Sequence, residues 1–317
     1  MSFAERLRAA DLILGEGSLY ERLRRDPAVQ FDPELAHATL IYDETARAVL
    51  EGTHREYLDI GQAHRLPMLT ASDTWRANRE RQDRSRFRDR PVNQDNVRFL
   101  QDVRTSYGPD AAPILIGGSF GPRGDAYRPA AALTRHDAAA FHAPQVDALA
   151  SAAPDYLIAN TLPAVSEARG MADACAATGV PYLLSFVVRG DGTVLDGTRL
   201  ADAIALIDDT ASVPPAGFGV NCVHPTVLAR ALQATGPAAV RVVYFQANAS
   251  ALTPDELVGS EELVGDGPAE LAEAIRTVRD HFGIRALGGC CGTGTAHIAA
   301  IATACELAPA GDGGAVP

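Results

Sequence analysis

Eight short apolar runs, each followed by a longer stretch with helical periodicity, constrain the fold of this chain more than any other feature. Repeated strand-then-helix units predict a parallel sheet with helices packed against it. Eight such units in 317 residues favour a single α/β domain, a closed (β/α)8 or TIM barrel. An open, doubly wound sheet is the alternative, because the order of strands cannot be read from sequence.

The barrel is expected to occupy residues 1–308, and the small residues of 309–317 predict a flexible tail. The predicted strands are Leu12–Gly15, Pro67–Thr70, Pro113–Gly117, Tyr156–Asn160, Tyr182–Val187, Gly217–Asn221, Val240–Phe245 and Ile284–Gly288. The predicted helices include Asn96–Tyr107 (with Asp95 as its cap), Arg135–Ala152, Val165–Thr178, Pro225–Ala234, Ala269–Phe282 and Thr295–Leu307.

Three of the five cysteines fall where predicted strands end. Cys222 follows the sixth strand, and the adjacent pair Cys290 and Cys291 follows the eighth. In a barrel these ends share the face that carries active sites, so the three thiols can converge. Three thiolate ligands favour a zinc site that keeps one position open, as catalytic zinc sites do. A redox disulfide between the vicinal cysteines is the competing interpretation.

Four other candidate ligands are assigned to packing. Cys175 and Cys305 lie in alanine-rich helical patterns and are expected in the core. His142 and His297 are expected to make helix and loop contacts, since the three cysteines suffice for a metal. The arginine-rich stretch Arg76–Arg90 follows the second strand and is interpreted as a loop on the catalytic face, with a solvated or subunit-contact surface favoured over anion recruitment.

Composition excludes several classes of function. The net charge of −12 argues against a nucleic-acid partner or an anionic membrane surface. All 28 basic residues are arginine, so Schiff-base chemistry on lysine and a Walker-type phosphate loop are both excluded. No apolar run approaches the length of a membrane span, and the charged N-terminus lacks a signal-peptide core. A cytoplasmic location is therefore expected, where clustered cysteines are more often metal-binding or catalytic than disulfide-bonded.

At this point the motifs resemble those of the homocysteine S-methyltransferase family, zinc-dependent barrels that act with betaine or S-methylmethionine as methyl donors. The resemblance spans nearly the whole chain and implies that Cys222, Cys290 and Cys291 are the zinc ligands. The motifs are Gly288-Gly289-Cys290-Cys291-Gly292-Thr293 with His297-Ile298, Val220-Asn221-Cys222 with Pro225, Gly118-Ser119-Phe120-Gly121-Pro122 with Gly124-Asp125 and Tyr127, His142 with Gln145, and Ser185-Phe186 with Asp196-Gly197.

The chain departs from the family pattern where the resemblance implies that two carboxylates hold the ammonium group of the substrate. An Asp-Gly pair is usual after the first strand, and here Glu16-Gly17 follows Gly15. A Glu-Thr pair is usual after the fourth strand, and here Asn160-Thr161 stands in its place. This chain therefore keeps at most one of the two carboxylates, Glu16.

The remaining candidates line the same face. For substrate binding they are Glu16, Gly17, Ser119, Asn160 and Asn221. The alternative interpretations are that Glu16 caps a helix, that Asn160 makes hydrogen bonds at the barrel rim, and that Ser119 stabilises a turn. Asn221 is expected to orient either a metal ligand or a substrate carboxylate. The aromatic rings predicted to pack against a cationic methyl donor are Trp75, Phe186 and Tyr244.

The predicted function is zinc-dependent transfer of a methyl group from a sulfonium or quaternary ammonium donor to the thiolate of homocysteine, giving methionine. The zinc ion handles the proton of the thiol, so no further catalytic residue is expected. The alternatives are the same chemistry on another small thiol, and a zinc-holding binding protein without turnover. The expected partners are the thiol and the donor. The sequence leaves the choice between a monomer and a homo-oligomer open.

Overall fold

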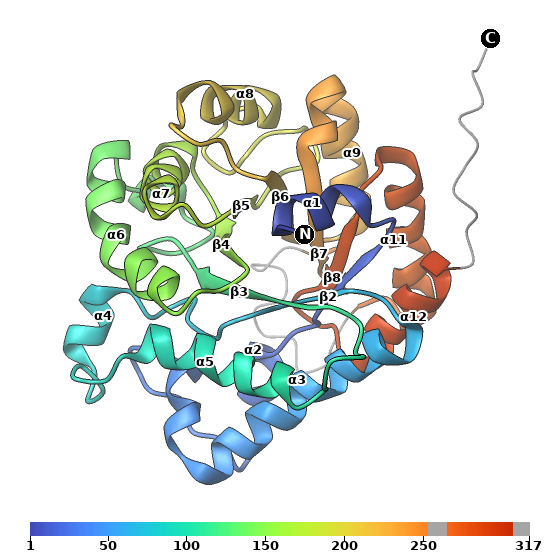
Figure 1. Cartoon of the computed structure of the whole chain (residues 1–317). Coiled ribbons are helices and arrows are strands. Elements are labelled where there is room, and N and C mark those ends of the chain that lie inside the picture. Colours follow the sequence, from blue (N-terminus) through green and yellow to red (C-terminus); the bar gives the residue numbers. More distant parts are fainter. Residues whose placement is uncertain (253–264, 307–317) are drawn as a thin grey trace.

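Eight parallel strands pair in sequence order and close into a barrel, in which β8 is hydrogen-bonded to β1 (Figure 1). The computed structural model describes residues 1–252 and 265–306. This closure confirms the predicted (β/α)8 barrel and excludes the open sheet. The strands are β1 (Ile13–Gly15), β2 (Met68–Ala71), β3 (Ile114–Phe120), β4 (Tyr156–Leu162), β5 (Tyr182–Phe186), β6 (Gly217–Val223), β7 (Val242–Ala247) and β8 (Ala286–Gly289).

Four strands run two or three residues beyond their predicted ends. The additional residues are Ser119 and its neighbours in β3, Thr161 and Leu162 in β4, Cys222 and Val223 in β6, and Gln246 and Ala247 in β7. The polar residues among them resembled loop residues in the sequence. They remain in the sheet because β-bulges let β4 and β6 continue past them.

A ring of helices covers the outside of the barrel (Figure 1). The helices are α1 (Phe3–Ala9), α2 (Tyr20–Leu23), α3 (Glu44–His64), α4 (Arg79–Arg84), α5 (Val92–Thr105), α6 (Arg135–Ser151), α7 (Val165–Thr178), α8 (Leu200–Thr210), α9 (Pro225–Thr235), α11 (Pro268–Phe282) and α12 (Thr295–Glu306). The short 3-10 helices are η1 (His37–Tyr42), η2 (Pro129–Ala131) and η3 (Gly236–Arg241).

Two helical predictions need correction. The fifth helix begins at Val92, with Pro91 as its N-cap, so Asp95 lies in the first turn rather than at the cap. The stretch Arg76–Arg90 is not all loop, because Asn78 caps the short helix α4. Most of its arginines point outward and pair with acidic neighbours. The predicted helix end at Leu307 and the tail at 309–317 lie outside the described residues.

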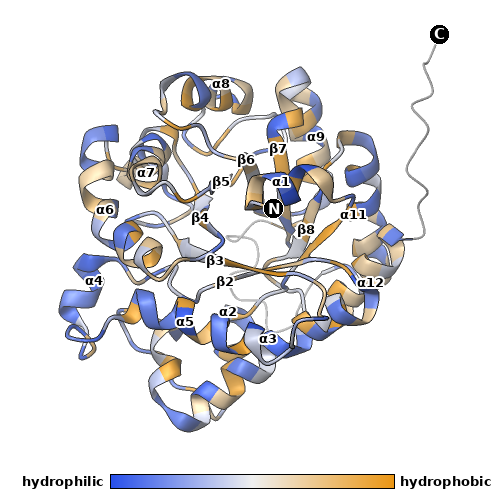
Figure 2. Cartoon of the chain, viewed as in Figure 1, coloured by the Kyte–Doolittle hydropathy of each residue, from blue (hydrophilic) through white to orange (hydrophobic). Residues whose placement is uncertain are grey.

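Apolar side chains fill two layers. One layer lies inside the barrel, and α1 lies across one end of it (Figure 1). Phe3 and Leu7 of α1 pack with the strand side chains of this layer. The ring of Phe3 stacks on Tyr156 with 4.5 Å between centroids. The other layer lies between strands and helices, and the helices turn their hydrophilic faces outward (Figure 2). With the barrel interior packed, the C-terminal ends of the strands are the place for a site.

Within the described residues, no helix combines the length and the apolar character that crossing a bilayer requires. The longest one, α3, is amphipathic, with Leu50, Tyr57 and Leu58 buried and a charged outer face.

Gly170 sets the approach of α7 to α6, which generates a stability test. A Cβ atom at Gly170 would lie 2.3 Å from the carbonyl oxygen of Arg135. We expect Gly170→Ala to lower the free energy of unfolding by about 1–3 kcal/mol, because the backbone of α6 must move. Gly52 in α3 has no atom within 4 Å of such a Cβ. Gly52→Ala should therefore raise stability, by up to about 1 kcal/mol. Urea unfolding of both variants checks this contrast, and equal effects would contradict it.

Candidate metal centre

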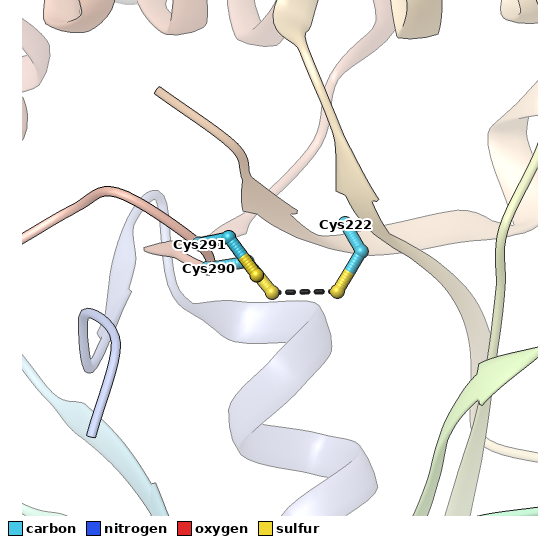
Figure 3. Close-up of side chains that lie close together, drawn as sticks. All are labelled: Cys222, Cys290 and Cys291. Atoms are coloured by element: carbon cyan, nitrogen blue, oxygen red, sulfur yellow. Dashed lines mark hydrogen bonds between the residues drawn. The ribbon is translucent and has the colours of Figure 1, made fainter. Parts of the chain in front are cut away.

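The thiols of Cys222, Cys290 and Cys291 converge at the C-terminal face of the barrel (Figure 3). Cys222 lies at the end of β6, and the pair directly follows β8. The three sulfur atoms lie within 4.8 Å of one another, and those of Cys222 and Cys290 are 2.6 Å apart. All three residues are partly buried, and none forms a disulfide.

A backbone bulge aims Cys222 at the pair. Cys222 has φ of 57°, in the left-handed region that residues other than glycine rarely adopt. The pairing of β6 with β7 shifts register at this point, between Asn221 and Val223. Thr161 in β4 has the same kind of conformation, with φ of 64°, also at a register shift. Strained backbone of this kind is commonly retained at functional sites.

The Asn221 side chain holds these two bulges together. Its Oδ1 accepts hydrogen bonds from the Thr161 amide at 2.9 Å and from the Ser185 hydroxyl at 2.7 Å. Its Nδ2 donates to the Thr161 hydroxyl at 2.8 Å and to the Cys222 sulfur at 3.2 Å. Asn221 is 2% exposed, and its amide is fully used by the protein. Of the two roles expected for it, orientation of a metal ligand fits these contacts.

The turn that carries Cys290 and Cys291 is fixed by the end of β7. The Cys290 amide donates to the Ala247 carbonyl at 2.7 Å, and the Cys291 amide donates to Asn248 Oδ1 at 3.2 Å. The next residue, Gly292, has φ of 80°, which a glycine adopts without a steric penalty. These contacts present two adjacent side chains on the same side of the turn.

The close approach of the three thiols shifts their pKa values. Contacts with Cys290 and Cys291 lower the pKa of Cys222 well below its usual value. The same contact with Cys222 raises the pKa of Cys290 well above its usual value and that of Cys291 to about 12. A divalent cation bound by these sulfurs would displace the thiol protons and stabilise all three thiolates.

The donor set fits zinc. Three sulfur atoms are soft ligands, which zinc and other thiophilic ions prefer to oxygen-ligating magnesium or calcium. In residues 1–252 and 265–306, no further His, Cys, Asp or Glu joins this group of potential ligands. Three protein ligands leave a tetrahedral ion one position for a substrate.

Tyr127, from the segment between β3 and α6, lies close to the thiols. Burial and the nearby sulfurs of Cys222, Cys291 and Cys290 raise the pKa of Tyr127. The buried carboxylate of Glu167 holds this segment at both ends. It accepts the amides of Arg123 at 2.8 Å and Leu133 at 3.4 Å. Tyr127 is still 38% exposed, so its side chain lies at the surface of the site.

Glu16 is part of a buried ionic group next to the site. Its Oε1 lies 2.6 Å from His54 Nδ1, and His54 Nε2 lies 3.1 Å from Asp73 Oδ2. Burial alone lowers the pKa of His54, but the charges of Glu16 and Asp73 outweigh it and raise this pKa to about 10. Burial raises the pKa of Asp73, but His54 and His37 outweigh it and hold this pKa well below its usual range.

The other predicted substrate residues lie on the same face. Asn160 at the end of β4 has a buried Oδ1 without a partner among the described residues. Ser119 in β3 is buried, with its backbone bonded to Ser72 and Thr74. Gly17 lies against Tyr57, so that a Cβ there would fall 2.8 Å from its hydroxyl oxygen. Gly17 thus has a packing role that sequence did not indicate.

The three aromatic candidates lie in different parts of the barrel. The indole of Trp75 is half-buried at the rim and donates to the Asn160 carbonyl at 3.1 Å, with the Arg76 guanidinium over its ring. Tyr244 is buried inside the barrel, close to Cys290 and Glu16. Phe186 is fully buried in the layer between strands and helices, where it stacks on Phe218. That placement argues against the predicted donor contact at Phe186.

Several residues of the site were not predicted as such. Tyr127 and Ser185 belonged to matching motifs without an assigned role. Asp73 stands in a polar run directly after β2, a position that could have drawn attention to it. His54 lies in a helix that the sequence analysis did not name. His142, expected to make a helix contact, pairs with Glu167 at 2.9 Å and thereby supports the segment of Tyr127.

Comparisons with known proteins agree with the geometry. The sequence profile described as homocysteine S-methyltransferase matches residues 13–305. Homocysteine S-methyltransferase of Escherichia coli (strain K12) is 32% identical over 219 residues, covering 65% of this chain and 68% of the relative. Betaine–homocysteine S-methyltransferase 1 of Bos taurus is 25% identical over 326 residues, covering 96% and 74%. The metallated form of the homocysteine methyltransferase MmuM from Escherichia coli superposes with a TM-score of 0.75 at 23% identity, covering 94% and 98%.

The raised pKa of His54 predicts how stability depends on pH. The folded protein holds this proton up to about pH 10, whereas the unfolded chain releases it near its ordinary pKa of about 6.5. The stabilisation is therefore complete below pH 6.5 and is lost as the pH rises towards 10, with a limiting slope of about 1.4 kcal/mol per pH unit. We expect the difference in unfolding free energy between the wild type and His54→Gln to shrink from pH 7 to pH 10. Denaturant unfolding across this range measures it, and a constant difference would contradict the assignment.

Proposed function

This chain belongs to the homocysteine S-methyltransferase family, and from that premise we propose that Cys222, Cys290 and Cys291 hold the zinc ion at which it transfers a methyl group to homocysteine. The observation that carries the proposal is the convergence of three thiols on the catalytic face, with no fourth His, Cys, Asp or Glu ligand among the described residues. A structural zinc site would have its four positions filled by the protein.

The residues around the thiols are suited to hold the ligands in place. Asn221 donates to the Cys222 sulfur and fixes its orientation, while the end of β7 fixes the pair. A zinc ion bound there supplies the thiol activation, because coordination favours the thiolate at neutral pH.

The transfer itself needs little further help from the protein. The sulfur of homocysteine forms a bond to the methyl carbon, and the bond from that carbon to the sulfonium sulfur or ammonium nitrogen of the donor breaks. The bonding pair stays on the donor and cancels its positive charge. The contribution of the barrel is to align the two reactants in line.

The substrates are recognised by residues of the same rim. We assign Glu16, Asn160 and Ser119 to the acceptor, with Gly17 as a packing residue beside Glu16. The buried Asn160 Oδ1 is an acceptor that a substrate N–H would satisfy. For the cationic donor we assign the aromatic faces of Trp75 and Tyr244. Reduced thiols at the centre suit a reducing compartment such as the cytoplasm.

Metal content and methyl transfer, measured on the same preparations, test this function. We expect about one zinc per chain in the wild type and methionine from homocysteine with S-methylmethionine, S-adenosylmethionine or betaine. Cys291→Ala should lose nearly all of both, because a site with two thiolates binds zinc poorly. Cys175→Ala is the matched control, since Cys175 is a fully buried core cysteine in α7, and it should keep its zinc.

Two outcomes would contradict the proposal. Zinc binding without any methylated homocysteine from any donor would indicate a binding protein. Methylation of another thiol in a panel, but not of homocysteine, would keep the chemistry and replace the acceptor.

A further inference from the structure

Four buried side chains form a hydrogen-bonded chain that ends beside the metal centre. It runs from His37 in η1 through Asp73 after β2 and His54 in α3 to Glu16 after β1. His37 Nε2 lies 3.2 Å from Asp73 Oδ1, and the two contacts of His54 are shorter, at 3.1 and 2.6 Å. Each of the four residues is less than 10% exposed. Burying so many ionisable groups costs stability unless they are paired, and even a paired group is a weak source of stability. A functional role for these four residues is therefore favoured.

Hydrogen bonding defines the charge of this chain. Both ring nitrogens of His54 face carboxylate oxygens, so both carry protons and the ring is an imidazolium. His37 faces a carboxylate with one nitrogen only, and its Nδ1 has no partner among the described residues. A neutral His37 satisfies this geometry. Two carboxylates and one imidazolium leave one negative charge in excess, and the ion pairs of Glu16 and Asp73 in the described part of the chain are with these histidines alone.

The excess charge lies on the Glu16 end. Asp73 receives a donor on each oxygen, from His37 and from His54. Glu16 receives His54 on Oε1, but its Oε2 has only the distant amide of Ala71 at 3.4 Å. Glu16 Oε2 can therefore accept a further, short hydrogen bond from a cation.

Glu16 is close to the reacting centre. Its carbonyl oxygen accepts the amide of Gly289 at 2.9 Å, and Gly289 directly precedes the cysteine pair. The buried ring of Tyr244 inside the barrel is close enough to Glu16 and to Cys290 for the charges of both to raise its pKa. The backbone of Glu16 is thus bonded to the strand that leads to Cys290 and Cys291, at the same end of the barrel as the thiols.

We propose that His54, backed by Asp73 and His37, is a positioning residue that turns Glu16 Oε2 towards the ammonium group of the acceptor, so that the site selects thiols bearing an amino group. The inference rests on the proposed function and adds to it the basis of acceptor selection. His54 fixes Oε1 of Glu16 and leaves Oε2 with only the distant amide of Ala71. Asp73 and His37 in turn prevent the imidazolium from rotating away.

A pair of acceptors separates this role from a merely structural one. Homocysteine and 4-mercaptobutanoate have the same thiol, chain length and carboxylate, and differ in the amino group alone. We expect the wild type to prefer homocysteine in kcat/KM by about tenfold or more, since a charged hydrogen bond is at stake. In His54→Gln this preference should fall by about tenfold through the KM for homocysteine, while kcat, zinc content and the values for 4-mercaptobutanoate change little.

His142→Gln is the matched control. His142 is as buried as His54 and also pairs with a buried carboxylate, that of Glu167, but it supports the Tyr127 segment instead of Glu16. Its replacement should affect both acceptors alike. Calorimetric titration of the zinc-loaded proteins with each thiol gives the same comparison without turnover.

The outcomes are distinguishable. An unchanged preference in His54→Gln, or an equal loss for both acceptors, overturns the inference. If this variant does not fold, Glu16→Gln takes its place and should abolish the preference for homocysteine. A Glu16→Gln enzyme that keeps this preference overturns the inference. A wild type that methylates both thiols equally well contradicts the inference while the proposed function stands. A wild type that methylates neither contradicts the proposed function itself.

Discussion

The side-chain amide of Asn221 is the interaction on which the metal centre depends. Its four hydrogen bonds join β4, β5 and β6 at the rim and connect the two bulges at Thr161 and Cys222, where the backbone is left-handed. One of these bulges turns Cys222 from the wall of the barrel towards the pair after β8. Without it, a regular strand would send successive side chains to opposite faces. Cys222 thus adopts the unfavourable left-handed conformation so that the three sulfurs can converge.

Two groups of negative charge share the mouth of the barrel. Three thiolates around a divalent ion keep one negative charge, and the chain that ends at Glu16 keeps another. Both reactants of the proposed transfer carry positive charge, the acceptor on its ammonium group and the donor on its sulfonium or ammonium centre. The donor loses its charge in the reaction, so its product is held less tightly than the donor itself. A mouth of this polarity favours binding of the reactants and release of one product.

The barrel could be predicted because the signals for it are local. Eight apolar runs and the helices between them favour a closed barrel without knowledge of any contact, whereas the strand order and the pairing of β8 with β1 come from the structure. The thiols could be predicted for the same reason, since Cys222 and the pair stand at strand ends in the sequence itself. The Glu16–His54 contact could not, because it joins α3 to β1 across 38 residues and leaves no pattern in either segment. The packing of Phe186 could not be predicted for a similar reason, since sequence placed it at a strand end but gave no sign that it faces the helices.

The central claim is that three cysteines hold zinc and leave one position for the acceptor thiol. Zinc K-edge X-ray absorption on the loaded protein tests it most directly, because it counts sulfur ligands around the ion. The account predicts three sulfurs and one lighter atom in the free protein, and four sulfurs after homocysteine is added. A coordination sphere that stays the same when homocysteine binds, or that holds fewer than three sulfurs in the free protein, would contradict it.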